Sequence, residues 1–142
     1  MAKPDPSLLD PARYPHSLAI PPRYADLDTN QHINNIAISA MFEDARLRFV
    51  VDATSGDPQD YQVMVVSLAI EYLDQTHYPD PIAFHSAIAR IGRTSAETIQ
   101  LATQQGRAVA LARTVFVTTD GTRAIPIPAK HAATLSEKVL RP

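Results

Sequence analysis

The sequence has 142 residues, of which 45% are hydrophobic and 20% are charged, and this length and balance predict one globular domain. The formal net charge of −2, with Lys and Arg scattered along the chain, excludes an electrostatic nucleic-acid-binding surface as the basis of function. The lack of cysteine excludes disulfides, thiolate metal sites and a cysteine nucleophile.

Hydropathy along the chain predicts a cytoplasmic protein with no membrane partner. No stretch approaches the roughly 18 uninterrupted apolar residues of a typical membrane span. The first residues also lack the charged-then-apolar pattern of a secretory signal.

Prolines are concentrated in the first 22 residues, which contain half of the 12 in the chain. This density predicts an extended, proline-rich arm over residues 1–16 that lies outside the core, followed by a short strand near residues 17–23. Because Pro21 and Pro22 have no N–H to donate, that strand is expected at a sheet edge or a bulge.

The next segment, residues 23–35, reads R-Y-A-D-L-D-T-N-Q-H-I-N-N and combines two carboxylates, a histidine and four side-chain amides. Asn34 and Asn35 are good N-cap residue types, so this segment is expected to open a helix. A helix start carries unsatisfied N–H groups and the positive end of the helix dipole, which favour acids and anions. The segment therefore predicts a functional site.

The helix is predicted over residues 35–52. Its apolar residues recur at three-, four- and seven-residue steps, which is the stripe of an amphipathic helix: Ile38, Met41, Phe42, Ala45 and Phe49. Gly56 and Pro58 follow as natural terminators.

Four β-rich runs follow, and they predict strands of an antiparallel sheet over residues 61–78, 82–91, 95–104 and 107–119. Gly92 and Gly106 fall between runs, and Gly121 belongs to an Asp-Gly turn after the last strand. A proline-rich link at residues 125–128 leads into a short helix predicted over residues 129–140.

These elements predict an α+β fold in which one long central helix is wrapped by a curved, five-stranded antiparallel sheet. A single helix cannot bury its apolar stripe alone, and a curved sheet offers the natural cover. We expect this domain to occupy residues 17–128, with the arm before it and a short C-terminal helix in residues 129–142. Open sheet edges favour pairing between copies, so a homodimer or homotetramer is expected.

The element order and the pattern Y-x-D-x-D-x-N-x-H-x-N-N, which starts at Tyr24, resemble the hotdog-fold thioesterase superfamily. This superfamily includes 4-hydroxybenzoyl-CoA thioesterases and plant acyl-ACP thioesterases. The resemblance covers residues 17–128, including the closing Ile-Pro-Ile-Pro. It implies that the substrate is an acyl thioester of CoA or of acyl carrier protein, and that the site is completed across a subunit interface.

The resemblance also implies residue roles. In the bacterial acyl-CoA branch an aspartate of this loop, matched by Asp28, is the nucleophile or general base. Backbone N–H groups at the helix start, matched by Asn35 and its neighbours, polarise the thioester carbonyl. In the plant enzymes the residues matching Asp28, Asn30 and His32 are functional.

Three positions depart from the family patterns. Many bacterial relatives have Gly where this chain has Gln31, and many have Tyr where it has Ile38. The plant enzymes have a downstream Glu-Cys pair where this chain, by position, has Gln75-Thr76. The first two differences bear on which subfamily the chain resembles and which substrate it takes. The third bears on whether the plant mechanism applies.

Thioester hydrolysis needs a nucleophile or base and an oxyanion binder, and this loop supplies candidates for both. A helix N-terminus favours the anionic form of Asp28. Asp26, two residues away, is an alternative for the same role, but it is expected to organise the loop by bonding backbone N–H groups, as Asp does in turns. His32 either orients Asp28, contacts the substrate or packs the loop.

Other residues are candidates for substrate binding. The Asn30 and Asn34 side chains either contact the substrate or act only as turn and cap residues. Tyr24 either lines an acyl tunnel or faces the core. The helix stripe is core first, but Ile38 and Met41 are also expected to line an acyl pocket. The other histidines lack the spacing of a metal site, so we expect no metal and no cofactor.

Two other functions remain open. Hotdog hydratases carry a signature resembling G-D-x-N-P-[LIV]-H, with Asp, Asn and His at relative positions 0, 2 and 5. Here Asp28, Asn30 and His32 stand at 0, 2 and 4 without the Gly or the Pro, which argues against lyase chemistry. A non-catalytic acyl-CoA-binding domain is the second alternative, although binding alone does not require an ionised carboxylate near an anionic ligand.

Overall fold

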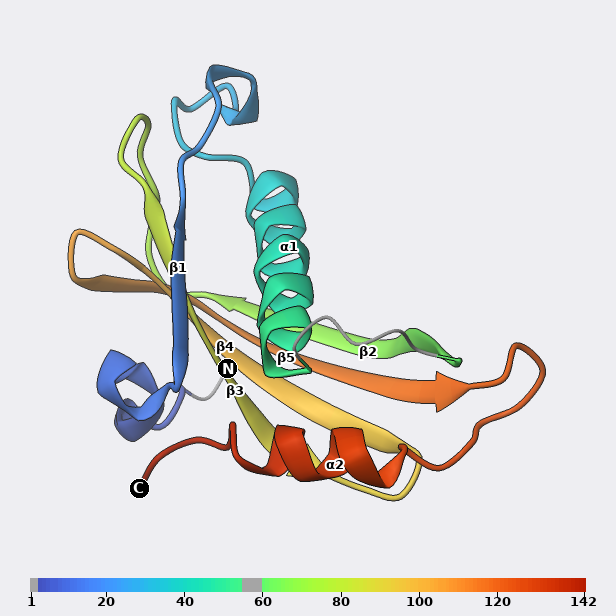
Figure 1. Ribbon diagram of the computed structural model, residues 1–142. Helices are drawn as coiled ribbons and strands as arrows, with labels where there is room; N and C mark the ends of the chain where they lie inside the picture. Colours follow the sequence, from blue (N-terminus) through green and yellow to red (C-terminus); the bar gives the residue numbers. More distant parts are fainter. Residues whose placement is uncertain (1–2, 55–59) are drawn as a thin grey trace.

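The computed structural model describes residues 3–54 and 60–142 (Figure 1). Gly56 and Pro58, the predicted helix terminators, lie outside the described residues, as do the first two residues of the predicted arm. No helix among the described residues could traverse a bilayer.

The central helix, α1, spans Asn35–Ala53 and confirms the predicted helix with one additional residue at its end. Asn34 is its N-cap, since the Asn34 Oδ1 accepts a hydrogen bond of 2.8 Å from the Ile36 N–H. All residues of the predicted apolar stripe are buried: Ile38, Met41, Phe42, Ala45 and Phe49. The local cap and the apolar stripe therefore account for where this helix begins and which face it buries.

Five antiparallel strands form one sheet in the order β1-β3-β4-β5-β2. Their bounds are His16–Ile20 for β1, Gln62–Tyr72 for β2, Ile82–Ile91 for β3, Ser95–Gln104 for β4 and Arg107–Thr119 for β5. The last three match the predicted ranges, and β1 lies at a sheet edge as Pro21 and Pro22 predict. Figure 1 shows the sheet curving around α1, and the expected α+β architecture is confirmed.

Two strands end earlier than predicted. β1 stops at Ile20, before the two prolines. β2 stops at Tyr72 because the N–H groups of Leu73 and Asp74 both turn to the Val109 carbonyl, at 2.9 and 3.3 Å, which ends the strand ladder.

The C-terminal helix, α2, spans Ala129–Ser136 and is shorter than the predicted 129–140. The residues after it pair with the sheet instead. The Ile88 N–H donates to the Lys138 carbonyl at 2.8 Å, and the Leu140 N–H donates to the Ile88 carbonyl at 3.2 Å. Hydrogen bonding to a strand therefore ends the helix.

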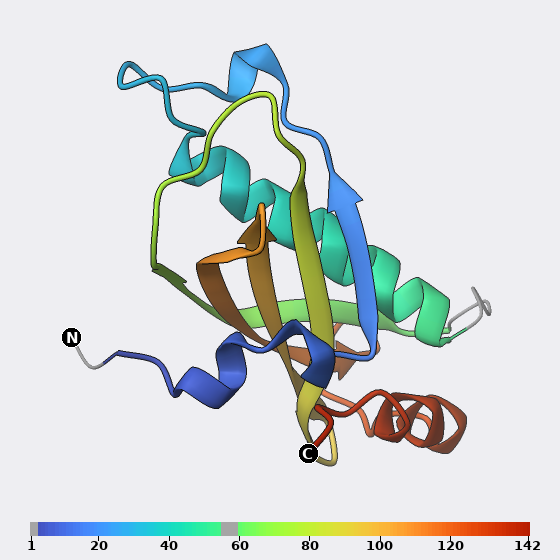
Figure 2. The same cartoon turned by 90° about the vertical axis from the view of Figure 1, so that its left-hand side faces the viewer.

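The two faces of the sheet are covered by different segments (Figure 2). α1 packs on one face, where it contacts β1, β3 and β4. The N-terminal segment crosses the other face as two 3-10 turns, Pro6–Leu9 and Pro11–Arg13. Tyr14 behind them is only 3% exposed and packs on β3, β4 and β5 residues Ala87, Ile99, Leu101 and Leu111.

The prediction of an extended arm outside the core is therefore wrong. The second apolar face of the sheet needs a cover, and the arm supplies it. Asp5 and Asp10 fold the arm by accepting hydrogen bonds from the N–H groups of Ser7 and Ala12, at 2.9 and 3.0 Å.

Candidate functional site

A pocket of about 500 Å³ opens at the first turn of α1. Three segments line it: the loop before α1, the start of α1, and the end of β2 with the loop that follows. The structure brings five of the predicted site residues together there: Asp28, Asn30, His32, Asn35 and Ile38. The third wall is formed by residues 72–76.

Asp28 is held by the backbone of its own loop. Its Oδ1 accepts hydrogen bonds from the N–H groups of Asn30, at 2.8 Å, and His32, at 3.1 Å. The Asp28 N–H in turn donates to the His32 carbonyl at 2.8 Å. Both hydrogen bonds to the side chain are accepted by Oδ1, so the loop orients the carboxylate. The Asp28 Oδ2 accepts no hydrogen bond from the described residues.

The turn that positions Asp28 needs a left-handed residue. Gln31 has a φ of 63°, a conformation that glycine adopts more readily than other residues. This is the position where many bacterial relatives have Gly. In this chain Gln31 therefore adopts the left-handed conformation itself.

Asp26 connects the loop to the chain before it. The Asp26 Oδ2 accepts from the Arg23 N–H at 2.8 Å, and its Oδ1 accepts from the Arg23 Nη2 at 2.9 Å. Its carbonyl accepts from the Asn34 N–H at 2.7 Å. The hydrogen bond from the Arg23 guanidinium, together with the one from the Arg23 backbone, lowers the pKa of Asp26 below its usual value. These contacts are those of a residue that organises the loop.

Replacing Asp26 by Asn should lower the free energy of unfolding at neutral pH by about 1–3 kcal/mol, because charged hydrogen bonds are lost at a carboxylate only 6% exposed. The pKa of Asp26 is lower in the folded state than in the unfolded state. The stabilisation is therefore complete above the unfolded-state pKa of about 3.9 and disappears as the pH falls through the folded-state pKa. Thermal melts of both proteins from pH 2 to 7 measure this. A melting-temperature difference that stayed constant down to the lowest pH would contradict the assignment.

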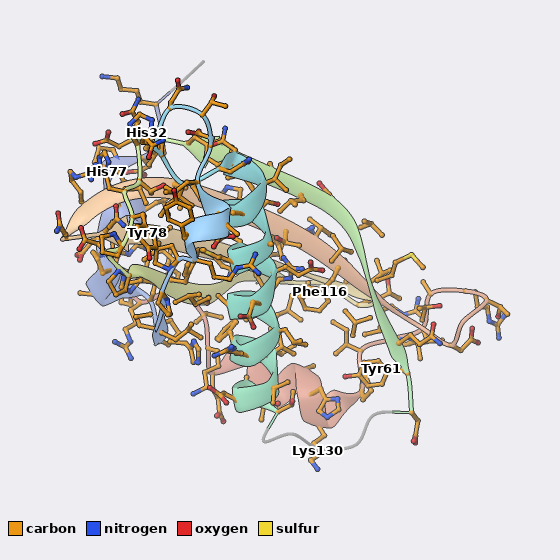
Figure 3. The ribbon with its side chains drawn as sticks, turned by 90° about the horizontal axis from the view of Figure 1, so that it is seen from above. His32, Tyr61, His77, Tyr78, Phe116 and Lys130 are labelled. Atoms are coloured by element: carbon orange, nitrogen blue, oxygen red, sulfur yellow. The ribbon has the colours of Figure 1, made fainter. Side chains whose placement is uncertain are left out.

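The His32 ring lies at the pocket but packs on another histidine. Its centroid is 5.4 Å from that of His77, and the two ring planes are inclined at 68°. Figure 3 shows both side chains beside each other near the first turn of α1. Among the described residues, the hydrogen bond between His32 and the Asp28 carboxylate comes from the His32 backbone.

The start of α1 lines the pocket through Asn35. As the first helical residue, Asn35 has no intrahelical acceptor for its N–H. The Tyr72 hydroxyl donates to the Asn35 carbonyl at 3.0 Å, which ties the end of β2 to this turn. The Asn34 side chain is used as the cap and does not line the pocket.

Tyr24 also lies outside the pocket. It belongs to a short 3-10 turn, Tyr24–Asp26, that projects beyond the end of β1. Its side chain is 75% exposed and packs edge-on against the Tyr78 ring, with the two ring centroids 6.0 Å apart. The alternative that Tyr24 faces the core is therefore wrong, because the sheet has already ended at this point.

Ile38 is both core and pocket wall, whereas Met41 is buried away from the pocket. Met41 instead borders a smaller hollow with Ile20 and Pro21. Of the two stripe residues that were expected to line an acyl pocket, only Ile38 lines the pocket at the start of α1.

The end of β2 and the loop after it contribute two further residues to the pocket, Tyr72 and Thr76. The sequence pattern did not single out Tyr72, whereas Thr76 stands, by position, where the plant enzymes have the Cys of their Glu-Cys pair. Gln104, only 2% exposed, holds the loop behind them: its Oε1 accepts from the His77 N–H at 2.9 Å, and its Nε2 donates to the His77 carbonyl at 2.7 Å. Tyr72 and Gln104 lie so far from the loop motif in the sequence that no local signal identifies them.

Comparison with known families agrees with this geometry. A profile described as thioesterase-like superfamily matches residues 22–135, a range that contains the whole site and all strands except β1. A search of curated proteins finds no match.

Solved structures from several bacteria share the fold. A predicted thioesterase from Bacillus stearothermophilus is 28% identical, with a TM-score of 0.80 over 89% of this chain and 97% of the other. A Thermus thermophilus thioesterase complexed with coenzyme A and Zn is 24% identical, with a TM-score of 0.80 over 92% and 98% of the two chains. The SAV2348 protein of Staphylococcus aureus, in complex with CoA, is 13% identical, with a TM-score of 0.80 over 89% and 85%. The expected hotdog fold is confirmed.

Proposed function

Because the chain belongs to the thioesterase-like superfamily, we propose that it hydrolyses an acyl thioester in the pocket at the start of α1. The observation that carries this proposal is the placement of an oriented carboxylate, Asp28, in one pocket with the unsatisfied N–H end of a helix. Hydrolysis requires both kinds of group, since a nucleophile or base must act while negative charge develops on the carbonyl oxygen.

In this mechanism the thioester carbonyl oxygen lies against the backbone N–H of Asn35, where the positive end of the α1 dipole stabilises the oxyanion. The N–H groups of Asn34 and Ile36 are already bonded, to the Asp26 carbonyl and the Asn34 Oδ1. Asp28 acts as the nucleophile or as the base that activates water. His32 and the Asn30 side chain lie at the same pocket and contact the substrate. The Asn34 side chain supports them by capping α1.

We assign the substrate to acyl-CoA, with acyl carrier protein as a variant carrier. Two structures that share the fold contain coenzyme A, which supports this choice. The enoyl-CoA hydratase alternative is disfavoured by the spacing of Asp28, Asn30 and His32.

A panel of acyl-CoA and acyl-carrier-protein thioesters tests the proposal when binding and free thiol release are measured together. A thioesterase releases thiol from at least one member of the panel. A hydratase consumes enoyl-CoA without releasing CoA, whereas a binding domain leaves every thioester of the panel unchanged. The proposal would be overturned if the protein bound thioesters of the panel but released thiol from none of them.

Acyl-chain preference should respond to Ile38, because it lies in the pocket wall. Ile38→Val removes one methylene equivalent, worth about 1 kcal/mol of apolar contact. The preference between acyl substrates that differ by one carbon should therefore change several-fold. Initial rates across a chain-length series measure this. Met41→Leu is the control, since Met41 is also buried, at 8% exposed against 3% for Ile38, but lies away from the pocket. If Ile38→Val slowed all substrates equally, Ile38 would serve only the core.

We also propose that the protein is a homodimer or a dimer of dimers that pairs through β2. This strand is a free sheet edge, and every residue from 62 to 69 is exposed. Its large apolar side chains are 42–55% exposed: Val63, Met64, Val65, Val66 and Leu68. An open, apolar edge strand is normally paired or covered.

A groove of about 770 Å³ between α1 and β2 continues this apolar surface. Its apolar lining comes mainly from both elements, with Phe116 of β5 between them: Leu47, Val50, Val51, Val63, Val65 and Phe116. Pairing through β2 would bring a second copy beside this groove. The same arrangement would place the partner near the pocket, whose wall includes Tyr72 at the end of β2.

A further inference from the structure

The Tyr72 side chain joins the end of β2 to the first turn of α1. Its hydroxyl donates a hydrogen bond of 3.0 Å to the Asn35 carbonyl, and both residues line the pocket that contains Asp28. Tyr72 is the last residue of β2, the strand at the free edge of the sheet. The hydrogen bond therefore connects two elements that are distant in sequence, at the wall of the pocket itself.

This hydrogen bond acts on one of the two peptide groups that determine where the Asn35 N–H points. The Asn35 carbonyl and the Ile36 N–H belong to one planar peptide group. Tyr72 holds the oxygen of this group, and the Asn34 Oδ1 accepts from its N–H at 2.8 Å. The peptide group before Asn35 is held as well, since the Asn34 carbonyl accepts from the Ile38 N–H at 3.0 Å. With both flanking peptide groups held, the direction of the Asn35 N–H is fixed.

The first turn of a helix is where such support matters. Its N–H groups have no intrahelical acceptors, and helix ends fray more readily than the middle of a helix. An oxyanion binder must be in place before the charge develops, because a donor that has to reorganise during the reaction stabilises the charge less. A contact from β2 supplies this rigidity and leaves the Asn35 N–H itself free to donate to a substrate.

We propose that Tyr72 is a positioning residue that orients the Asn35 N–H toward the developing oxyanion. This rests on the proposed thioester hydrolysis. Tyr72 acts through the Asn35 peptide group and takes no part in proton transfer, since its hydroxyl proton is donated to the Asn35 carbonyl. Burial raises the pKa of Tyr72 above its usual value, so the hydroxyl remains a donor at neutral pH.

Removal of the Tyr72 hydroxyl tests this role. Tyr72→Phe keeps the ring in the pocket wall, and kcat should fall by about 5-fold to 20-fold because the oxyanion donor is less well held. KM and the affinity for a thioether analogue, which has no carbonyl oxygen, should stay within about 2-fold of the parent values. Tyr78→Phe is the matched control. Tyr78 is 41% exposed, close to the 42% of Tyr72, but it lies outside the pocket lining and its hydroxyl bonds to none of the described residues. This control should keep the kcat and KM of the parent protein.

A trifluoromethyl-ketone analogue of the substrate separates positioning of the donor from a general loosening of the pocket. Its carbonyl carbon adds an oxygen nucleophile and becomes tetrahedral, so its oxygen resembles the oxyanion of the reaction. The affinity of Tyr72→Phe for this analogue should fall by the same factor as kcat, while the affinity for the thioether analogue is unchanged. Tyr72→4-aminophenylalanine restores an N–H donor on the same ring and should recover most of the turnover.

Equal turnover of folded Tyr72→Phe and the parent protein would overturn the inference. Affinities for the ketone and the thioether that fell together would also overturn it, since Tyr72 would then shape the pocket as a whole. So would a 4-aminophenylalanine variant that was no more active than Tyr72→Phe. Circular dichroism verifies the folding of each variant. Thiol release by the parent protein is measured first: its absence refutes the proposed function and this inference with it, whereas its presence with unchanged turnover in Tyr72→Phe refutes the inference alone.

Discussion

Replacing Asp28 by Asn is expected to lower turnover by about 100-fold to 10,000-fold while the protein remains folded. The amide oxygen of Asn can still accept the hydrogen bonds from the Asn30 and His32 N–H groups, so the loop keeps its shape. The variant loses the charge needed to attack or to take a proton, and loss of a positioned proton-transfer group typically has an effect of this size. Initial rates of CoA release measure the change, with circular dichroism to verify folding.

Two neighbouring variants make this test specific. Asp26→Asn should retain more turnover and lose more stability, because Asp26 bonds to Arg23 and lies outside the pocket lining. His32→Ala should fall between the two if the ring orients Asp28 or touches substrate, and should be nearly silent if it only packs on His77. Near-normal hydrolysis by folded Asp28→Asn would refute the proposed mechanism.

A lysine at the β2 edge should convert the protein to monomers. Leu68→Lys places a charge in the exposed apolar strand, and charged residues on edge strands prevent pairing between sheets. The mass measured by light scattering at micromolar concentration should fall from a multiple of the chain mass to that of a single chain. Turnover should fall with it, because the resemblance implies a site completed by the second subunit.

Val139→Lys is the matched control for this change. Val139 is 45% exposed, close to the 47% of Leu68, but it lies after α2 and away from β2. This variant should keep the mass and the turnover of the parent protein. A parent protein that is strictly monomeric and still hydrolyses its substrate would disprove the oligomer proposal.

The sequence by itself determined those features that depend on neighbouring residues. The Asn34 cap and the apolar stripe of α1 are local signals, so the helix start and its buried face were predicted correctly. Strands β3, β4 and β5 were also predicted to the residue, since glycine turns and short polar links bound them. The resemblance in the segment from Tyr24 to Asn35 then led to the family, which the match over residues 22–135 confirms.

Only the tertiary structure decided which residues meet across the fold. Tyr14 is buried because an apolar sheet face required a cover, and nothing in the proline-rich arm signals that demand. β2 ends early because two N–H groups turn to the Val109 carbonyl of another strand. Thr76 reaches the pocket because its carbonyl bonds to Ile33, which is distant in sequence. Periodicity and caps act over a few residues, whereas pocket walls depend on strand pairing and loop contacts between distant segments.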